Sequence, residues 1–336
     1  MEPQEEKPDV EAERSIPGAT HGLVSLSDAA DDALHIVSKH FWGDADRVRL
    51  STGLEDLDRQ LGGLHPGELI ILAARPSMGK TALAVGIALR IARDYAWESG
   101  PDGSRRMVRG GVAAYFSPQT SAENIAVCFL AQMSEAPADQ IRSGEINYSE
   151  HVRVRDSAQA IGNAPLFIDA TSGLSIAQLS ERARRLARID GLALIVVDHL
   201  QLFTAHIEPA GGQGQGIRQV TRRLKALAQE LATSVIALVP LPQEIGGARP
   251  GISDLRAIGP VEEDADVILF IHRNIDTRGS SAPRQCPVEQ AASQQPTELT
   301  PNFAEVIIAK QGHGPTGAVR LHFNESVGKF SPMSSC

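Results

Sequence analysis

The stretch Leu69-Ile70-Ile71-Leu72-Ala73-Ala74-Arg75-Pro76-Ser77-Met78-Gly79-Lys80-Thr81 decides the fold of this chain. Its apolar first half predicts a buried strand, and a helical pattern begins at Lys80. The second half matches the phosphate-binding loop G-x-x-x-x-G-K-[ST], with alanine in place of the first glycine. In such a loop, backbone N–H groups and the helix start surround a polyphosphate, the lysine contacts the β- and γ-phosphates, and the hydroxyl binds Mg²⁺. The predicted nucleotide-binding residues are therefore Ala74, Arg75, Pro76, Ser77, Met78, Gly79, Lys80 and Thr81.

Short apolar runs alternate with helical patterns along the rest of the chain. Further apolar runs cover residues 112–116, 166–168, 192–197, 235–239 and 267–271, and the helical patterns cover residues 80–95, 122–133, 176–189 and 217–231. Strands that are apolar on both faces and joined by helices are typical of a mostly parallel, doubly wound α/β sheet. A C-terminal β-hairpin is predicted from residues 303–310 and 318–323.

Two regions near the start of the chain, and one internal segment, depart from this alternation. Residues 1–27 are rich in Pro, Glu and Asp and predict a disordered leader. An apolar stripe at helical spacing follows, so residues 28–50 predict a linker helix and a linker. The main domain is expected over residues 51–330, with a mobile surface insertion at residues 274–302 that is rich in Ser, Pro, Gln and Thr.

Composition excludes several classes of protein. The 336 residues include 41 acidic and 32 basic side chains, a formal charge of −9, which argues against a basic architectural DNA protein. The cysteines Cys128, Cys286 and Cys336 form no C-x-x-C pair, which argues against a disulfide framework or a zinc cluster and fits a reducing cytosol. No apolar stretch approaches about 18 residues and the N-terminus does not resemble a signal peptide. We therefore expect a cytoplasmic protein that does not act at a membrane.

A carboxylate follows another apolar run. Leu194-Ile195-Val196-Val197 predicts a strand that ends in Asp198. Ligands of doubly wound sheets bind at the carboxyl ends of the strands, so Asp198 is expected beside the Mg²⁺ that Thr81 binds. Thr81 and Asp198 are the predicted metal ligands.

Several motifs in the same order together resemble the ATPase domain of DnaB-type replicative DNA helicases. Besides the phosphate-binding loop they are Ser51-Thr52-Gly53-Leu54-Glu55-Asp56-Leu57-Asp58, Gly62-Gly63-Leu64, Val197-Asp198-His199-Leu200-Gln201-Leu202, Leu224-Lys225-Ala226-Leu227-Ala228, Ser253-Asp254-Leu255-Arg256 and Ile307-Ile308-Ala309-Lys310-Gln311. The resemblance implies a RecA-like P-loop core that binds ATP and Mg²⁺ at subunit interfaces and assembles as a six-membered ring around single-stranded DNA. It identifies residues 28–41 as the family's linker helix, which packs on a neighbouring subunit. The family's N-terminal helical domain, which recruits primase, is expected to be absent because only 27 residues precede this helix.

The resemblance also assigns roles to individual residues. Asp198 matches the Walker B carboxylate, and Gln201 matches a polar residue that follows it. Arg256 and Gly259 match a loop that holds the DNA backbone, where contacts grip phosphate without reading sequence. A solvated arginine is the alternative for Arg256.

Three departures fall on the catalytic groups of the family. Gln119 stands where the family has the glutamate that activates water, and an amide orients water but takes no proton. The finger motif Lys-Gln-Arg-Asn-Gly is here Lys310-Gln311-Gly312-His313-Gly314, so Lys310 remains but the arginine is missing. Val239-Pro240-Leu241 replaces a Ser-Gln-Leu that senses phosphate. A general base contributes about 10² to 10⁴ in rate and an arginine finger about 10³ to 10⁵, so we expect ATP binding with weak hydrolysis.

The sequence leaves three functions open: an ATP-driven DNA helicase, a non-catalytic nucleotide-binding subunit or regulator of a helicase ring, and a RecA- or KaiC-like ATPase outside replication. The expected assembly is a homo-hexamer or a mixed ring with an active helicase. The candidate catalytic residues are Gln119, Asp198 and Lys310. Other clusters have simpler explanations: Arg182, Arg184, Arg185 and Arg188 are expected on a solvated helix face, and Cys128 in the core.

Overall fold

The computed structural model describes residues 26, 30, 34, 50–99, 105–204, 213–242, 248–273 and 303–333. The chain divides into two compact units, residues 1–45 and 46–336. In the first unit Leu26, Ala30 and Leu34 are described, and all three are helical and exposed, at the spacing of one helix face. The predicted leader, most of the predicted linker helix and the predicted insertion at residues 274–302 lie outside the described residues.

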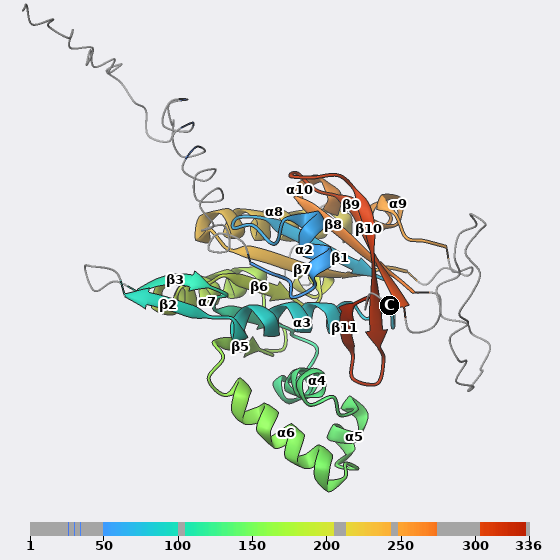
Figure 1. Ribbon diagram of the computed structural model, residues 1–336. Helices are drawn as coiled ribbons and strands as arrows, with labels where there is room; N and C mark the ends of the chain where they lie inside the picture. Colours follow the sequence, from blue (N-terminus) through green and yellow to red (C-terminus); the bar gives the residue numbers. More distant parts are fainter. Residues whose placement is uncertain are drawn as a thin grey trace, which may run out of the picture. The chain divides into compact units, whose positions relative to one another are not determined.

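The second unit is built on a mostly parallel sheet (Figure 1), which confirms the predicted fold class. Among the described strands, nine form this sheet in the order β11-β10-β9-β8-β1-β7-β6-β4-β5. Their bounds are β1 Leu69–Ala74, β4 Ala113–Phe116, β5 Leu166–Asp169, β6 Leu194–Val197, β7 Ser234–Pro240, β8 Val267–His272, β9 Phe303–Lys310, β10 Gly317–Asn324 and β11 Lys329–Pro332. The strands from β8 to β5 in this order are parallel, and β9, β10 and β11 add to the β8 edge in antiparallel pairs. The predicted C-terminal hairpin is β9 and β10.

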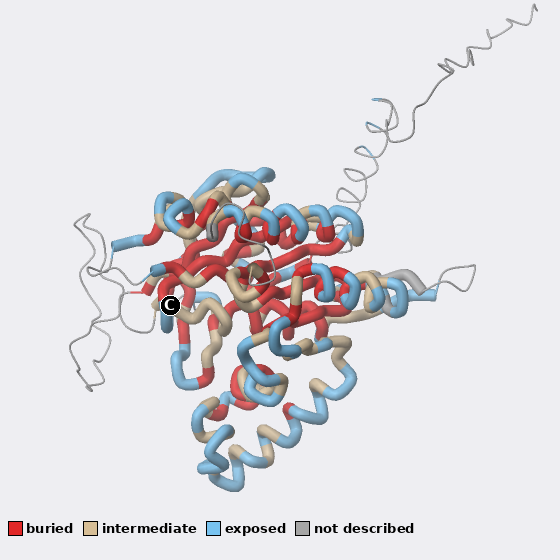
Figure 2. Tube along the Cα trace, turned by 180° about the vertical axis from the view of Figure 1, so that it is seen from behind, coloured by how far each residue is buried: buried red, intermediate tan, exposed pale blue. Residues whose placement is uncertain are grey.

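Helices cover both faces of the sheet, as the apolar strands require. The principal ones are α3 (Lys80–Arg93), α4 (Ala122–Ser134), α7 (Ile176–Asp190) and α8 (Gln213–Leu231). Alternate residues of β1 point to opposite faces. Ile70 and Leu72 therefore join the core cluster under α3 and α4, whereas Leu69 and Ile71 join the cluster under α7 and α8. The buried segments form the central layer of this unit in Figure 2.

Several elements were not predicted from the sequence, and some bounds differ. The additional elements are α2 (Glu55–Leu61), β2 (Ala96–Ser99), β3 (Arg105–Arg109), α5 (Ala138–Ser143), α6 (Tyr148–Ile161), the 3₁₀ helix η2 (Leu200–Thr204), α9 (Ile252–Arg256), α10 (Val261–Asp264) and β11. The helix expected over residues 80–95 ends at Arg93, because the chain turns there into the two-stranded ribbon β2–β3. The helix expected from residue 217 begins at Gln213.

The parallel strands bring their carboxyl ends to one edge of the sheet. Ala74 of β1 pairs with Pro240 of β7, and Phe116 of β4 pairs with Val197 of β6. The segments that follow these strands therefore meet along the same edge, as the sequence predicted for ligand-binding residues. None of the helices described is long and apolar enough to span a membrane.

Candidate functional site

The predicted phosphate-binding loop, residues 74–81, joins β1 to α3 through two residues in the left-handed region. Ser77 has φ 65° and Gly79 has φ 95°. The loop lines a cavity of about 330 Å³, which Pro240, Phe323 and Glu325 complete on the other side. Seven of the eight predicted nucleotide-binding residues line this cavity; Met78 does not, because its side chain packs against the core cluster under α3.

Thr81 and Asp198 meet beneath the loop, as predicted. The Thr81 hydroxyl donates a hydrogen bond of 3.1 Å to Asp198 Oδ2. Lys80 interacts electrostatically with this carboxylate. Burial lowers the pKa of Lys80, and the negative charge of Asp198 opposes that shift. A hydroxyl and a carboxylate suit Mg²⁺, which prefers oxygen ligands and usually keeps several waters beside substrate phosphates. Among the described residues no group of three or more His, Cys, Asp or Glu side chains is placed to hold a metal.

Tyr115 is a site residue that the sequence reasoning missed. It lies in β4 with its side chain fully buried, and its hydroxyl donates a 2.9 Å hydrogen bond to Asp198 Oδ2, the oxygen that also accepts from Thr81. Burial raises the pKa of Tyr115 well above its usual value, and the nearby Asp198 carboxylate adds to the shift.

Arg273 is a second residue that was missed. It follows β8 and is only 3% exposed. Its guanidinium donates a 3.0 Å hydrogen bond to the Ser77 carbonyl and another of 3.0 Å to Glu325 Oε2, and it lies 4.4 Å from the centroid of the Phe323 ring. Arg273 therefore ties the loop to the turn between β10 and β11. Arg75 anchors the loop on another side by donating to the Ala248 carbonyl at 2.7 Å.

Gln119 lies at the carboxyl edge of the parallel strands, the edge that also carries the loop of residues 74–81. It is exposed in the connection between β4 and α4, three residues beyond Phe116. Gln201 is held nearby, in η2, where its amide group contacts the Pro240 carbonyl at 3.5 Å and His199 Nδ1 at 3.0 Å. Burial lowers the pKa of His199, with the Gln201 hydrogen bond and the Asp198 charge opposing the shift and the Lys80 charge adding to it.

Lys310 lies at the opposite edge of the sheet. It is aligned with Ile268, near the start of β8. Its ammonium group donates to the carbonyls of Glu262 and Ala265, at 2.8 and 2.6 Å, around the end of α10. One copy of the chain therefore does not bring Lys310 together with Gln119 and Asp198.

The two predicted DNA-binding residues lie beside α10. Arg256 ends α9, not a loop as expected, and its side chain is 70% exposed while its Nε donates to Glu262 Oε1 at 2.7 Å. Gly259 is buried against α8, where an added Cβ would lie 3.3 Å from Ile217 Cγ2. The structure thus places Arg256 on the surface, whereas Gly259 is buried.

The arginine-rich face of α7 carries ion pairs within the chain. Arg182 pairs with Asp169, and both nitrogens of the Arg184 fork contact Glu230 at 2.7 and 2.8 Å. These pairs fit the predicted solvated helix face. Cys128 is half-buried and packs against the core, as expected.

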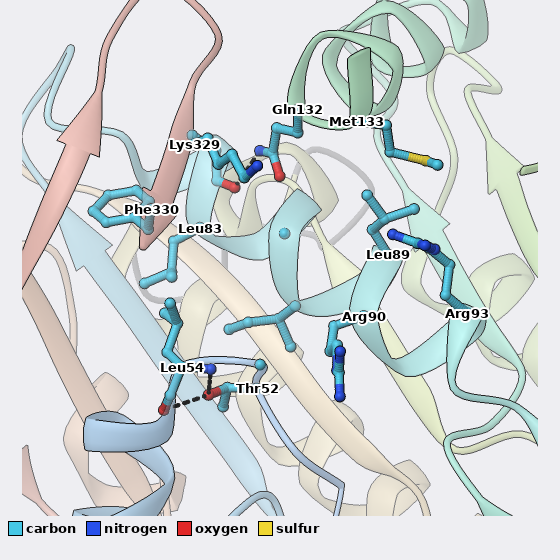
Figure 3. Close-up of a pocket in the computed structure, with 14 residues that line it drawn as sticks. Thr52, Leu54, Leu83, Leu89, Arg90, Arg93, Gln132, Met133, Lys329 and Phe330 are labelled. Carbon is cyan, nitrogen blue, oxygen red and sulfur yellow. Dashed lines mark hydrogen bonds between the residues drawn. The ribbon is translucent and has the colours of Figure 1, made fainter. Parts of the chain in front are cut away.

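A second cavity of about 210 Å³ lies between α3, α4, β11 and residues 52–54 (Figure 3). Gln132 lines this cavity, and its amide donates to the carbonyls of Ala82 and Gly328 at 2.8 and 2.7 Å. Arg90 and Arg93 also line it. None of the predicted site residues lines this second cavity.

Comparisons with known proteins agree with this geometry. Residues 49–332 match the family model described as the DnaB-like helicase C terminal domain. The chain is 33% identical over 291 residues to the replicative DNA helicase DnaB of Rickettsia conorii, covering 86% of this chain and 58% of that protein. It is 36% identical over 295 residues to the DnaB of Haemophilus influenzae, covering 85% of this chain and 55% of that protein.

Solved structures give the same family. One solved ATPase domain superposes with a TM-score of 0.72 at 26% identity, covering 90% of this chain and 98% of that chain. A DnaB-like replicative helicase, studied with its interactions with primase, gives a TM-score of 0.73 at 25% identity and covers 94% of this chain and 69% of that chain. The chain spans somewhat more than half the length of the curated relatives it matches. The match of residues 49–332 to the family model, on a chain built around a mostly parallel sheet, means that this chain belongs to the DnaB-like helicase C-terminal domain family, with a RecA-like fold.

Proposed function

We propose that this chain binds Mg²⁺-ATP and acts on single-stranded DNA in replication as a cytoplasmic, ring-forming helicase-like protein whose ATP hydrolysis is weakened. The observation that carries this proposal is the hydrogen bond between Thr81 and Asp198 beneath the phosphate-binding loop. The threonine hydroxyl and the carboxylate would hold the metal. Lys80 would contact the phosphates, and the loop would surround them.

The groups around the site favour binding over turnover. Gln119 offers an amide where a base would be needed. Gly312 has no side chain to reach a neighbouring nucleotide. The losses of a base and of a finger are each worth at least about a hundredfold in rate, although such effects do not add. Nucleotide affinity depends instead on the loop, Lys80 and the metal ligands, which the sequence retains.

The arrangement of the two edges has a consequence for assembly. The loop lies at the carboxyl edge of the parallel strands, and the hairpin that carries Lys310 and Gly312 turns at the other. In a ring, this hairpin would face the nucleotide of the next copy. One such chain within a ring of active helicase subunits would then weaken its own site and that of its neighbour. This favours a second candidate function, a non-catalytic subunit or regulator of a mixed ring.

The DNA contact is also a proposal. The exposed side chain of Arg256 would grip the backbone of single-stranded DNA, and the buried Gly259 would let the connection between α9 and α10 pack on α8. Such a contact would not discriminate between base sequences.

Restoring the two lost groups tests the catalytic part of the proposal. The variant carrying both Gln119→Glu and Gly312→Arg should hydrolyse ATP at least about a hundredfold faster than wild type in the presence of single-stranded DNA. Gly312 tolerates a side chain, because no atom lies within 4 Å of an added Cβ. The matched control, Gln119→Asn with Gly312→Ala, should leave the rate unchanged. Wild-type turnover of about ten per second, an ordinary enzyme rate, would refute weakened hydrolysis.

Strand displacement distinguishes the two candidate functions. A helicase separates a forked duplex alone, whereas a regulatory subunit only changes the rate at which an active DnaB helicase does so. Mixing the chain with such a helicase at rising ratios should lower displacement if rings are mixed. Displacement that stays constant at every ratio would contradict the mixed ring.

A further inference from the structure

Tyr115 occupies a position where packing alone does not require its hydroxyl. The ring belongs to β4, which lies between β5 and β6 in the sheet, and Tyr115 is 0% exposed. It packs edge-on against Phe129 of α4, with ring centroids 6.3 Å apart. A phenylalanine would make these apolar contacts equally well. The hydroxyl therefore needs a separate explanation, because a buried donor without an acceptor is costly.

That explanation lies in the acceptor. Tyr115 Oη is 2.9 Å from Asp198 Oδ2, and Thr81 Oγ1 is 3.1 Å from the same oxygen. The two donors come from different elements, β4 and α3, which approach the carboxylate from different parts of the fold. Two such donors on one oxygen restrict the rotation of the carboxylate about both side-chain torsions.

We infer that Tyr115 is a positioning residue for the magnesium site: it holds Asp198 in the orientation that faces Thr81. This inference rests on the proposed binding of Mg²⁺-nucleotide at that site. Groups that hydrogen-bond to metal-ligating side chains fix their orientation, and their loss typically lowers metal affinity about 10- to 100-fold. Tyr115 is suited to this role because its phenolic hydroxyl is a hydrogen-bond donor and its buried ring holds that donor against Asp198.

The test separates metal coupling from nucleotide binding. Tyr115→Phe removes the hydroxyl and keeps the ring. The affinity for ATP is measured in EDTA, and the Mg²⁺ concentration that gives half of the metal-dependent increase in affinity is then determined by titration. We expect this concentration to rise about tenfold or more in the variant. The affinity in EDTA should stay within about twofold of wild type, because the phosphate-binding loop is untouched.

Two controls make the result specific. Tyr95→Phe makes the same chemical change at a half-buried tyrosine just beyond the end of α3 and should leave both measurements unchanged. Tyr115→Met removes the hydroxyl with a different apolar side chain and should reproduce the metal effect, and melting curves show which variants are folded.

Three outcomes would contradict the inference or the proposed function on which it rests. A Mg²⁺ requirement within about twofold of wild type in the folded variants would overturn the inference. An equal loss of ATP affinity in EDTA and in Mg²⁺ would show a merely structural role and would overturn it as well. If wild type itself bound ATP with no dependence on Mg²⁺, the proposed function would fail before the role of Tyr115 was in question.

Discussion

Gly79 has two independent reasons to be glycine. Its φ of 95° lies in the left-handed region, and an added Cβ would lie 2.9 Å from Phe330 Cζ and 3.1 Å from Phe323 Cζ. The first reason is shared with Gly144, whose φ is 78°, but nothing lies within 4 Å of a Cβ added there. The two positions therefore separate backbone strain from a steric clash at the phosphate-binding loop.

This comparison gives a prediction for stability and binding. Gly144→Ala should lower the free energy of unfolding by about 1 to 2 kcal/mol, the cost of a left-handed conformation in a residue with a Cβ. Gly79→Ala should lower it further and also weaken ATP binding, because the loop or both rings must move. Denaturant unfolding and nucleotide titration measure the two effects. Equal losses of stability, with ATP affinity unchanged in both variants, would contradict the clash.

At the same scale, the sequence predicted the site residues that belong to a local motif and missed those that act across the fold. The loop from Ala74 to Thr81 is contiguous, so its pattern is readable. Tyr115 is 83 residues away from Asp198, and Arg273 is 196 residues away from Ser77. In an apolar run a tyrosine resembles any other packing residue. Only the pairing of β4 with β6 shows that its hydroxyl reaches the site.

Among the secondary-structure elements, those that bury apolar residues were the predictable ones. The bounds expected for β1, residues 69–74, agree with the structure because all six residues are buried. By contrast, Ser157 is the only buried residue of α6, so this helix has no apolar stripe to detect. Its start does carry a signal: Asn147 and Glu150 form a capping box, in which each side chain accepts from the backbone N–H of the other. The ribbon β2–β3 has few apolar residues and carries no period-2 pattern.

The hairpin between β9 and β10 contacts the start of β1 through a buried acid. Glu68 is 6% exposed, and His313 Nε2 in the hairpin turn lies 3.2 Å from Glu68 Oε1. Burial raises the pKa of Glu68; the Asp266 charge adds to the shift, and a backbone hydrogen bond at His65 and the His313 and Lys225 charges oppose it. The stability that comes from protonated Glu68 is therefore present below the unfolded value of 4.5 and is lost as pH rises through the higher folded value.

Glu68→Gln removes this titration. The melting temperature of the variant minus that of wild type should increase between about pH 4 and about pH 7, because only wild type acquires a buried charge over that range. Glu145→Gln changes an exposed glutamate in the same way and serves as the control. A difference for Glu68→Gln that is constant or falls with rising pH would contradict the raised pKa.

At the scale of the whole molecule, the feature that matters most for assembly is that the two ends of the parallel strands carry different parts of the proposed site. The phosphate-binding loop and Asp198 lie at one edge of the sheet, and Lys310 with the β9–β10 turn lies at the other. If copies assemble into a ring, each nucleotide would be shared between two chains. Gln119 and Gly312 of one copy would then act at two different interfaces. The proposals on hydrolysis and on mixed rings both require that the loop holds a nucleotide.

Equilibrium titration of the purified chain with ATP at saturating Mg²⁺ tests that central claim most directly. We predict saturable binding to one site per chain, weakened about 10- to 100-fold by Lys80→Ala, since a hydrogen bond to a charged group contributes about 1.5 to 3 kcal/mol. Lys329→Ala, which removes an ammonium group paired with Glu135 outside the site, should bind as wild type does. Absence of binding, or equal affinity in wild type and Lys80→Ala, would contradict the account.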